Sequence, residues 1–301
     1  TLNAFLKSLL ESHLLDALLV AVELPTGHSV TAALVRHQER LGGAAPLAPV
    51  MPVSTARVVS QLTRNAPSKK RVGVVLRSCE LRALLELVKL KQASLENLVL
   101  IGMDCPGTYS VAGYDELCRQ TATPVEDFLK GRSPDLQIRE ACRVCEYPAP
   151  PNADLVLGLI GLDVEKEILV QATSPEGQRL LEALKLPPAT EEEKRKRETA
   201  LSELVAERIK ARDELFSQAQ VEAGGLGNLL AMLSACVNCH NCRVACPLCY
   251  CRECFFDSAT FEWEAEKYLG WAGKKGALRM PTDTLLFHLT RLNHMVMSCV
   301  G

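Results

Sequence analysis

The feature that most constrains this chain is a dense run of cysteines near its C-terminal end. Seven of its 13 cysteines lie between Cys236 and Cys254. Within that run, Cys236, Cys239, Cys242, Cys246 and Pro247 have the spacing C-x2-C-x2-C-x3-C-P, by which bacterial proteins hold iron–sulfur cubanes. Closely spaced thiolates can each reach a different iron of one cluster. The spacing therefore predicts a [4Fe-4S] site, with zinc as the alternative because Cys-x2-Cys pairs also build zinc ribbons.

Further cysteines follow this motif without matching it. Cys249, Cys251 and Cys254 could complete a cluster, bind another metal or stay reduced, and the sequence leaves these choices open. Cys299, followed by two residues, would begin a second Cys-x2-Cys pair if the chain continued with cysteine. A two-cluster ferredoxin segment that is cut short is the natural interpretation, and we expect one or both ends of the chain to be incomplete. His240 is expected to be solvated, because thiolates already fill the ligand positions.

Composition narrows the class of protein. The chain has 301 residues, is 48% hydrophobic and carries a net charge of −2, so it can bury a large core and offers no basic surface for nucleic acid. It contains no apolar run of about 18 residues that could span a membrane, and its first residues lack the basic stretch and cleavage site typical of a signal peptide. An odd number of cysteines with two-residue spacings favours metal binding over disulfides. We therefore expect a cytoplasmic metalloprotein.

The first part of the chain alternates between strand and helix patterns. Compact apolar runs separated by amphipathic helices predict a mainly parallel sheet that is covered on both faces, that is, an α/β fold. We assign residues 1–187 to this domain. Its predicted strands are 16–22, 71–76, 97–103 and 154–160, and its predicted helices include 54–64 and 80–90.

The remaining chain divides into two segments. Residues 188–222 are rich in charge and predict a helical spacer, a long solvated helix with one packed edge. A helix that docks a partner is the alternative. The glycines at 224, 225 and 227 break this pattern, and residues 223–301 form a smaller helical, ferredoxin-like, cysteine-rich domain in this interpretation.

A second, dispersed set of cysteines lies in the α/β part. Cys79 and Cys105 follow predicted strands, and Cys142 and Cys145 form a Cys-x2-Cys pair before the last one. Because the carboxyl ends of parallel strands share one edge of a sheet, these loops could place four thiolates around one cluster. Buried structural thiols are the alternative. Cys118 is interpreted as an ordinary thiol.

Nucleotide-binding motifs are weak in this sequence. It contains no Walker loop and no strand-linked G-x-G-x-x-G. Arg77 and Ser78, at the start of a predicted helix, could receive an anion, with Ser78 as a simple helix N-cap as the alternative.

These residues together resemble a known family. The segments Leu76–Leu84, Ile101–Cys105 and Cys142–Cys145, followed by Ala153–Gly158, resemble the beta subunits of coenzyme F420 hydrogenases and dehydrogenases. The attached cysteine-rich segment is similar to that of the formate dehydrogenase branch. The resemblance implies FAD and a [4Fe-4S] cluster held by the dispersed set Cys79, Cys105, Cys142 and Cys145. It also implies flavin neighbours near the strand ends: Arg77, Ser78, Gly102, Asp104, Asp154 and Gly158.

The expected function is that of an oxidoreductase subunit. Electrons would pass between a hydride carrier, FAD and [4Fe-4S] clusters, and then to a partner subunit of a formate dehydrogenase, hydrogenase or heterodisulfide reductase type complex. The glycine-rich stretch typical of the family is not recognisable around residues 24–33, so the carrier could be F420, NAD(P) or none. A flavin-free iron–sulfur relay and a zinc-stabilised scaffold are the alternatives.

Overall fold

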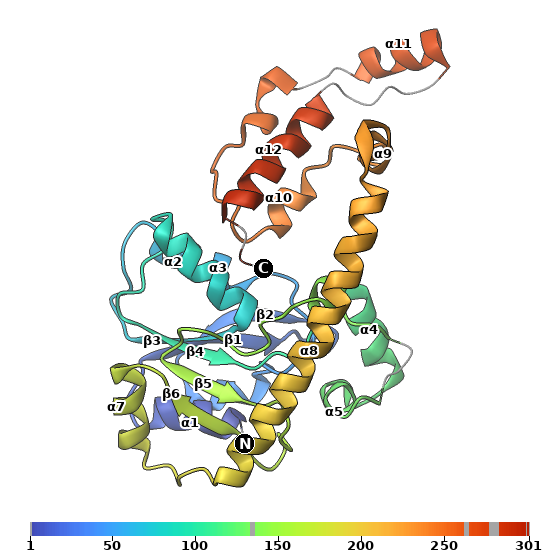
Figure 1. The fold of residues 1–301 in the computed structure, drawn as a ribbon. Coiled ribbons are helices and arrows are strands. Elements are labelled where there is room, and N and C mark those ends of the chain that lie inside the picture. The colour runs from blue at the N-terminus through green and yellow to red at the C-terminus, as the bar shows by residue number, and fades with distance from the viewer. Residues whose placement is uncertain (1, 133–135, 262–264, 277–282, 299, 301) are drawn as a thin grey trace. The chain divides into compact units, whose positions relative to one another are not determined.

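The fold centres on one mixed six-stranded sheet. The computed structural model describes residues 2–132, 136–261, 265–276, 283–298 and 300. The strand order is β2-β1-β3-β4-β5-β6, in which β1, β3, β4 and β5 run parallel and the edge strands β2 and β6 run antiparallel to their neighbours. This confirms the predicted α/β fold with a mainly parallel sheet (Figure 1).

The strands are short and mostly buried. They are β1 (Ala17–Glu23), β2 (Val30–Val35), β3 (Val72–Arg77), β4 (Leu98–Met103), β5 (Leu155–Gly158) and β6 (Leu169–Ala172). Every residue of β3 and β5 is buried, as expected for central strands that are covered on both faces. The predicted inner strands agree with β1, β3, β4 and β5, whereas the edge strands β2 and β6 were not predicted.

Helices precede, connect and follow these strands. In the first part of the chain they are α1 (Leu2–Glu11), η1 (Gln38–Gly43), α2 (Thr55–Thr63), α3 (Ser78–Lys89), α4 (Val111–Gln120), α5 (Pro124–Leu129), α6 (Glu140–Arg143) and α7 (Pro175–Leu184). Figure 1 shows α2 and α3 on one face of the sheet and α1 with α7 on the other.

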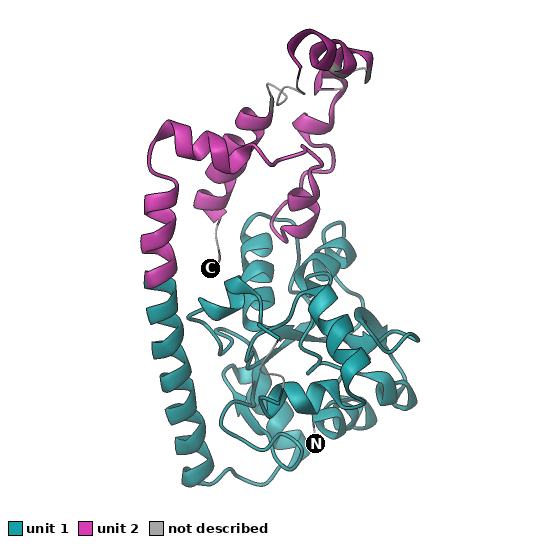
Figure 2. Cartoon of the chain, turned by 90° about the vertical axis from the view of Figure 1, so that its right-hand side faces the viewer, with its two compact units in different colours: residues 1–213, 301 teal, residues 214–300 magenta. Residues whose placement is uncertain are grey.

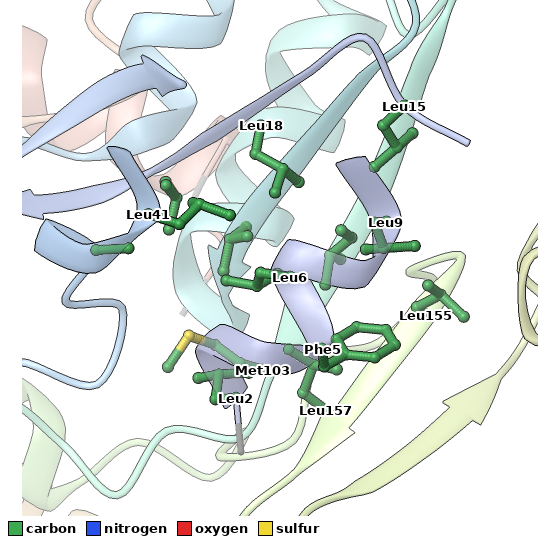
Figure 3. Close-up of a cluster of buried hydrophobic side chains, with 14 of the residues drawn as sticks. Leu2, Phe5, Leu6, Leu9, Leu15, Leu18, Leu41, Met103, Leu155 and Leu157 are labelled. Atoms are coloured by element: carbon green, nitrogen blue, oxygen red, sulfur yellow. The ribbon is translucent and has the colours of Figure 1, made fainter. Parts of the chain in front are cut away.

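The main core lies between α1 and the sheet. Apolar residues of α1 recur at helical spacing, so one face of the helix is buried. Leu6 and Leu9 are fully enclosed and pack with strand residues such as Leu18 and Leu157 (Figure 3). This packing anchors the start of the chain beneath the parallel strands.

The chain divides into two compact units, residues 1–213 and 214–300 (Figure 2). The division falls inside the 32-residue helix α8 (Glu191–Glu222), which occupies the segment predicted as a charged spacer. The second unit contains α9 (Gly225–Leu233), α10 (Asn241–Ala245), η2 (Phe255–Asp257), η3 (Ala259–Phe261), α11 (Ala265–Lys275) and α12 (Asp283–Ser298). Its described residues are helical or irregular, without a strand. That this unit folds as a ferredoxin, and that the chain has three parts, remain predictions.

Within the described ranges, no helix combines the length and the apolar character needed to cross a bilayer.

Candidate functional site

The dispersed cysteines are positioned by the carboxyl edge of the parallel sheet. Arg77 at the end of β3 pairs in register with Met103 at the end of β4. Cys79 therefore lies in the first turn of α3 and Cys105 lies just beyond β4, side by side in the fold. Cys142 belongs to the short helix α6, in the long connection from β4 to β5, and Cys145 follows it.

Three of these thiols are within electrostatic range of one another. Burial raises the pKa of Cys79 to about 12, and unfavourable charge interactions with Glu80, Cys105 and Cys142 add to this. Burial also raises the pKa of Cys105, with Cys142 contributing. Thiols with such raised pKa values are protonated and unreactive near neutral pH, and a metal must displace the proton to bind there.

Hydrogen-bond donors and cations surround the same thiols. Arg77, a Gly107 backbone N–H and Arg208 each act to lower the pKa of Cys105 against the effect of burial. The Thr108 hydroxyl lies 3.4 Å from the sulfur of Cys142.

Cys145 has its own cationic neighbour. The Arg82 guanidinium is 3.8 Å from its sulfur and lies over the Tyr147 ring, 4.5 Å from the ring centroid. Donors of this kind stabilise the anionic sulfurs of an iron–sulfur cluster.

The donor set fits a cluster better than a single ion. Within the described ranges, no group of three or more His, Cys, Asp or Glu side chains is arranged to hold one metal ion. Each cysteine of a cubane binds a different iron, so its four ligands lie further apart than the ligands of one zinc. Four thiols from three loops, three of them beside arginines and the fourth beside the Thr108 hydroxyl, suit a cluster. The assignment of the ligands remains a prediction.

The first two predicted flavin neighbours, Arg77 and Ser78, form hydrogen bonds to carbonyl oxygens of the chain. Arg77 is buried and donates to the carbonyl oxygens of Ala48, at 2.6 Å, and Pro46, while its charge faces Glu80 at 3.8 Å. Ser78 is the first residue of α3, and its hydroxyl donates to the Ala149 carbonyl at 3.2 Å. The alternative of Ser78 as the helix N-cap is wrong, because Arg77 occupies that position.

The other predicted flavin neighbours at this edge of the sheet, Gly102, Gly158 and Asp104, are packed or hydrogen-bonded within the chain. An ideal Cβ on Gly102 would lie 2.6 Å from Pro150, and one on Gly158 would lie 2.5 Å from Arg197 Nε. Asp104 is fully buried and accepts two hydrogen bonds from Arg197, at 2.9 and 2.7 Å.

Asp154 lies apart from this edge of the sheet. It precedes β5, accepts from the Leu100 N–H at 2.8 Å and from the Ser174 hydroxyl at 2.6 Å, and so stands at the opposite end of that strand from Gly158. Whether any of the six residues contacts a flavin remains a prediction.

The C-terminal cysteine run forms a second candidate site. Cys236, Cys242, Cys246, Cys249 and Cys254 are half-buried, and Cys239 and Cys251 are exposed. Burial raises the pKa of Cys249, with Cys246, Cys251 and Cys254 adding to the effect, so these four lie near one another. Cys299 falls outside the described residues.

His240 is not solvated, contrary to the expectation. Its side chain is 15% exposed, and its Nδ1 lies 2.7 Å from an Asp257 carboxylate oxygen. Its ring packs against Phe287 with centroids 4.3 Å apart. The surrounding aromatic side chains exclude water from a residue that the sequence places between cysteines.

Sequence reasoning missed the contribution of α8 to the first site. Arg197 pairs with Asp104, Arg208 donates to the carbonyl oxygens of Pro106 and Cys145, and Arg212 pairs with Glu146. Eleven residues separate the first two arginines, which is about three helical turns and places them on one face. That periodicity was the available signal, but arginines on a highly charged helix are usually solvated.

Comparison with known proteins supports the resemblance. No family model matches the chain. It is 23% identical to an F420-dependent formate dehydrogenase subunit beta from Methanocaldococcus jannaschii, over 99% of this chain and 82% of the relative. It is 22% identical to an F420-dependent formate dehydrogenase 1 subunit beta from Methanococcus maripaludis, over 98% and 80%. The chain is thus similar to these beta subunits along nearly its whole length.

A solved structure shows that the fold is shared as well. A chain of the F420-reducing [NiFe] hydrogenase complex from Methanosarcina barkeri superposes with a TM-score of 0.50 at 14% identity, covering 75% of this chain and 86% of that one. The comparisons thus confirm the family resemblance inferred from the cysteine contexts. At this identity, the solved structure supports the fold alone.

Proposed function

We propose that this chain is the iron–sulfur electron-transfer subunit of an F420-dependent formate dehydrogenase or hydrogenase type complex. The observation that carries the proposal is the convergence of Cys79, Cys105 and Cys142 from three separate loops at the carboxyl edge of the sheet. Cys145 is the fourth ligand of the proposed [4Fe-4S] cluster. The near full-length similarity to beta subunits of formate dehydrogenases supports the same role.

The C-terminal run extends the electron path in this proposal. Cys236, Cys239, Cys242 and Cys246 have cubane spacing, and Cys249, Cys251, Cys254 and Cys299 are the further candidate ligands. Electrons would leave the chain for a partner subunit, which is a formate dehydrogenase, hydrogenase or heterodisulfide reductase-like protein. Several clusters in one chain suit a relay, because a cubane accepts one electron at a time.

FAD and a soluble hydride carrier, F420 or NAD(P), complete the proposal. When bound, a flavin accepts a hydride and releases its two electrons singly to clusters. The six predicted flavin neighbours are already hydrogen-bonded or covered by the chain itself. This observation favours a second candidate, a flavin-free iron–sulfur relay in the same kind of complex.

The first experiment is metal and flavin analysis of the anaerobically purified chain. We expect about four iron and four sulfide per cluster. We also expect one FAD per chain if the chain passes electrons from a hydride carrier through a flavin to its clusters. Iron without flavin, and no dye reduction by reduced F420, NADH or NADPH, would favour the relay. Zinc without iron would contradict both and support a scaffold.

A matched pair of variants tests the dispersed cluster. Cys79→Ser removes a proposed ligand, so the chain should lose about four iron. Cys118→Ser alters another partly buried thiol, which lies on α4 and packs against an apolar cluster, and should retain all its iron. Equal iron content in the two variants would refute the assignment of Cys79.

A further inference from the structure

Arg208 is unusual among the residues of α8. It is the one buried residue of that helix, 4% exposed, on a segment that is otherwise half-buried or exposed. Removing a guanidinium from water is costly unless its donors are satisfied. The groups that Arg208 contacts must therefore satisfy its donors and account for its burial.

Those groups belong to two cysteine loops. Arg208 Nη2 donates to the carbonyl oxygen of Pro106, at 2.7 Å, and Nη1 donates to the carbonyl oxygen of Cys145, at 3.3 Å. Pro106 directly follows Cys105. One guanidinium therefore ties together the loops that carry two of the four dispersed cysteines, 102 and 63 residues away in sequence.

The charge of Arg208 is not neutralised by a carboxylate. Arg77, Arg197 and Arg212 each pair with an acidic side chain, but within the part of the chain that the structure describes, Arg208 forms no ion pair. Its contacts are neutral carbonyl oxygens, at Pro106 next to Cys105 and at Cys145 itself, so its positive charge lies uncompensated beside both cysteine loops. The charge of Arg208 therefore lies next to the backbone of the proposed cluster site.

We propose that Arg208 is a positioning residue of the dispersed cluster, which holds the Cys105 and Cys145 loops together and raises the reduction potential of the cluster. This inference rests on the proposed function. Reduction adds one electron, and thus one negative charge, to the cluster and breaks no ligand bond. A fixed positive charge nearby therefore stabilises the reduced form. Net charge and hydrogen bonding are the factors that set such potentials.

The test uses the full chain, with all seven cysteines from Cys236 to Cys254 changed to Ser so that the C-terminal run gives no competing signal. Arg208→Met removes the charge and keeps the bulk, whereas Arg208→Lys keeps the charge but loses the two-pronged contact. Lys210→Met removes a charge from an exposed position on the same helix and is the matched control. The readouts are the cluster midpoint potential, by dithionite titration followed by electron paramagnetic resonance, and the rate of iron loss to a chelator.

We expect Arg208→Met to lower the reduced-to-oxidised ratio at a fixed potential about tenfold, a shift of about 59 mV for one electron. Lys210→Met should leave it unchanged. Arg208→Lys should keep the midpoint near that of the parent and lose iron several-fold faster. An unchanged midpoint in Arg208→Met would overturn the proposal.

If Arg208→Met retains no cluster, the lysine variant decides. Loss of iron at the parental rate in Arg208→Lys would then refute the positioning role. A parent chain that holds no iron at the dispersed site would instead refute the proposed function itself, which separates the two failures.

Discussion

The ion pair between Arg197 and Asp104 should be a principal stabiliser of the α/β unit. Asp104 is fully buried, and its carboxylate accepts from Arg197 and from the Leu159 N–H at 3.0 Å. The Arg197 side chain is 14% exposed. Arg197→Met would therefore leave a buried carboxylate without its counter-charge.

The expected cost follows from the burial of this pair. Removing one partner of a buried ion pair destabilises a protein by about 3–5 kcal/mol. The two remaining hydrogen bonds to Asp104, from the backbone N–H groups of Leu159 and Ile160, place the variant near the lower end, at about 3 kcal/mol. Lys194→Met, which breaks an exposed pair with Glu191, should leave the free energy of unfolding essentially unchanged, because solvent screens that pair.

Urea denaturation can separate the two units of the chain. Circular dichroism follows the whole chain, whereas both tryptophans, at positions 263 and 271, lie after residue 213 and report on the second unit. With a denaturant slope of about 3 kcal/mol/M, Arg197→Met should lower the midpoint of the first unit by about 1 M. The tryptophan transition should stay in place.

A double-mutant cycle provides the refutation. Adding Asp104→Asn to Arg197→Met removes the unpaired charge, so the double variant should recover part of the lost stability. If Arg197→Met unfolds at the same urea concentration as Lys194→Met, the ion pair contributes little and our reasoning is wrong.

Three further predictions concern packing and charge. Gly161 has a φ of +80°, and a Cβ there would lie 2.8 Å from Ala200 Cβ, so Gly161→Ala should cost about 2–3 kcal/mol. Gly131→Ala, also at positive φ but with open space around it, should cost only about 1 kcal/mol, and a circular dichroism melt compares the two. His240→Ala should destabilise the second unit by about 1–2 kcal/mol, seen as an earlier tryptophan transition, whereas His294→Ala, at an exposed position, should not. Burial, with Arg291 adding, lowers the pKa of His288 in the folded chain, so the unfolded chain binds the proton more readily. The tryptophan transition should therefore move to lower urea as the pH falls below about 6.5, and less so in His288→Gln; an equal pH dependence in the variant would contradict this.

The inner sheet was predictable because its signal is local. The strands β3 and β4 are compact apolar runs next to amphipathic helices, and central parallel strands need such residues on both faces. The edge strand β6 contains no buried residue, so its sequence lacks that signal. It pairs with β5 through backbone hydrogen bonds. Because nearly all residue types carry the same backbone groups, the sequence gives little indication of this pairing.

The sequence also suggested which cysteines would share a site, because the order of parallel strands places their carboxyl ends together. It did not show what would surround those thiols. Gly158 and Gly161 lack the side chains that would clash with residues of α8, so this helix can approach the chain closely there. Arg197 covers Gly158 itself, and such packing is visible only in the folded chain.

The sequence by itself determined the cysteine spacing, the buried strands and the long charged helix, since each lies within one short segment. Only the tertiary structure decided which arginines of that helix are buried and what they bind. Arg197 meets Asp104 across 93 residues, and Arg208 meets Pro106 across 102. A charged side chain on a helix has the same local pattern whether it faces water or a buried carbonyl, so the choice between them is made by the surface against which the helix packs.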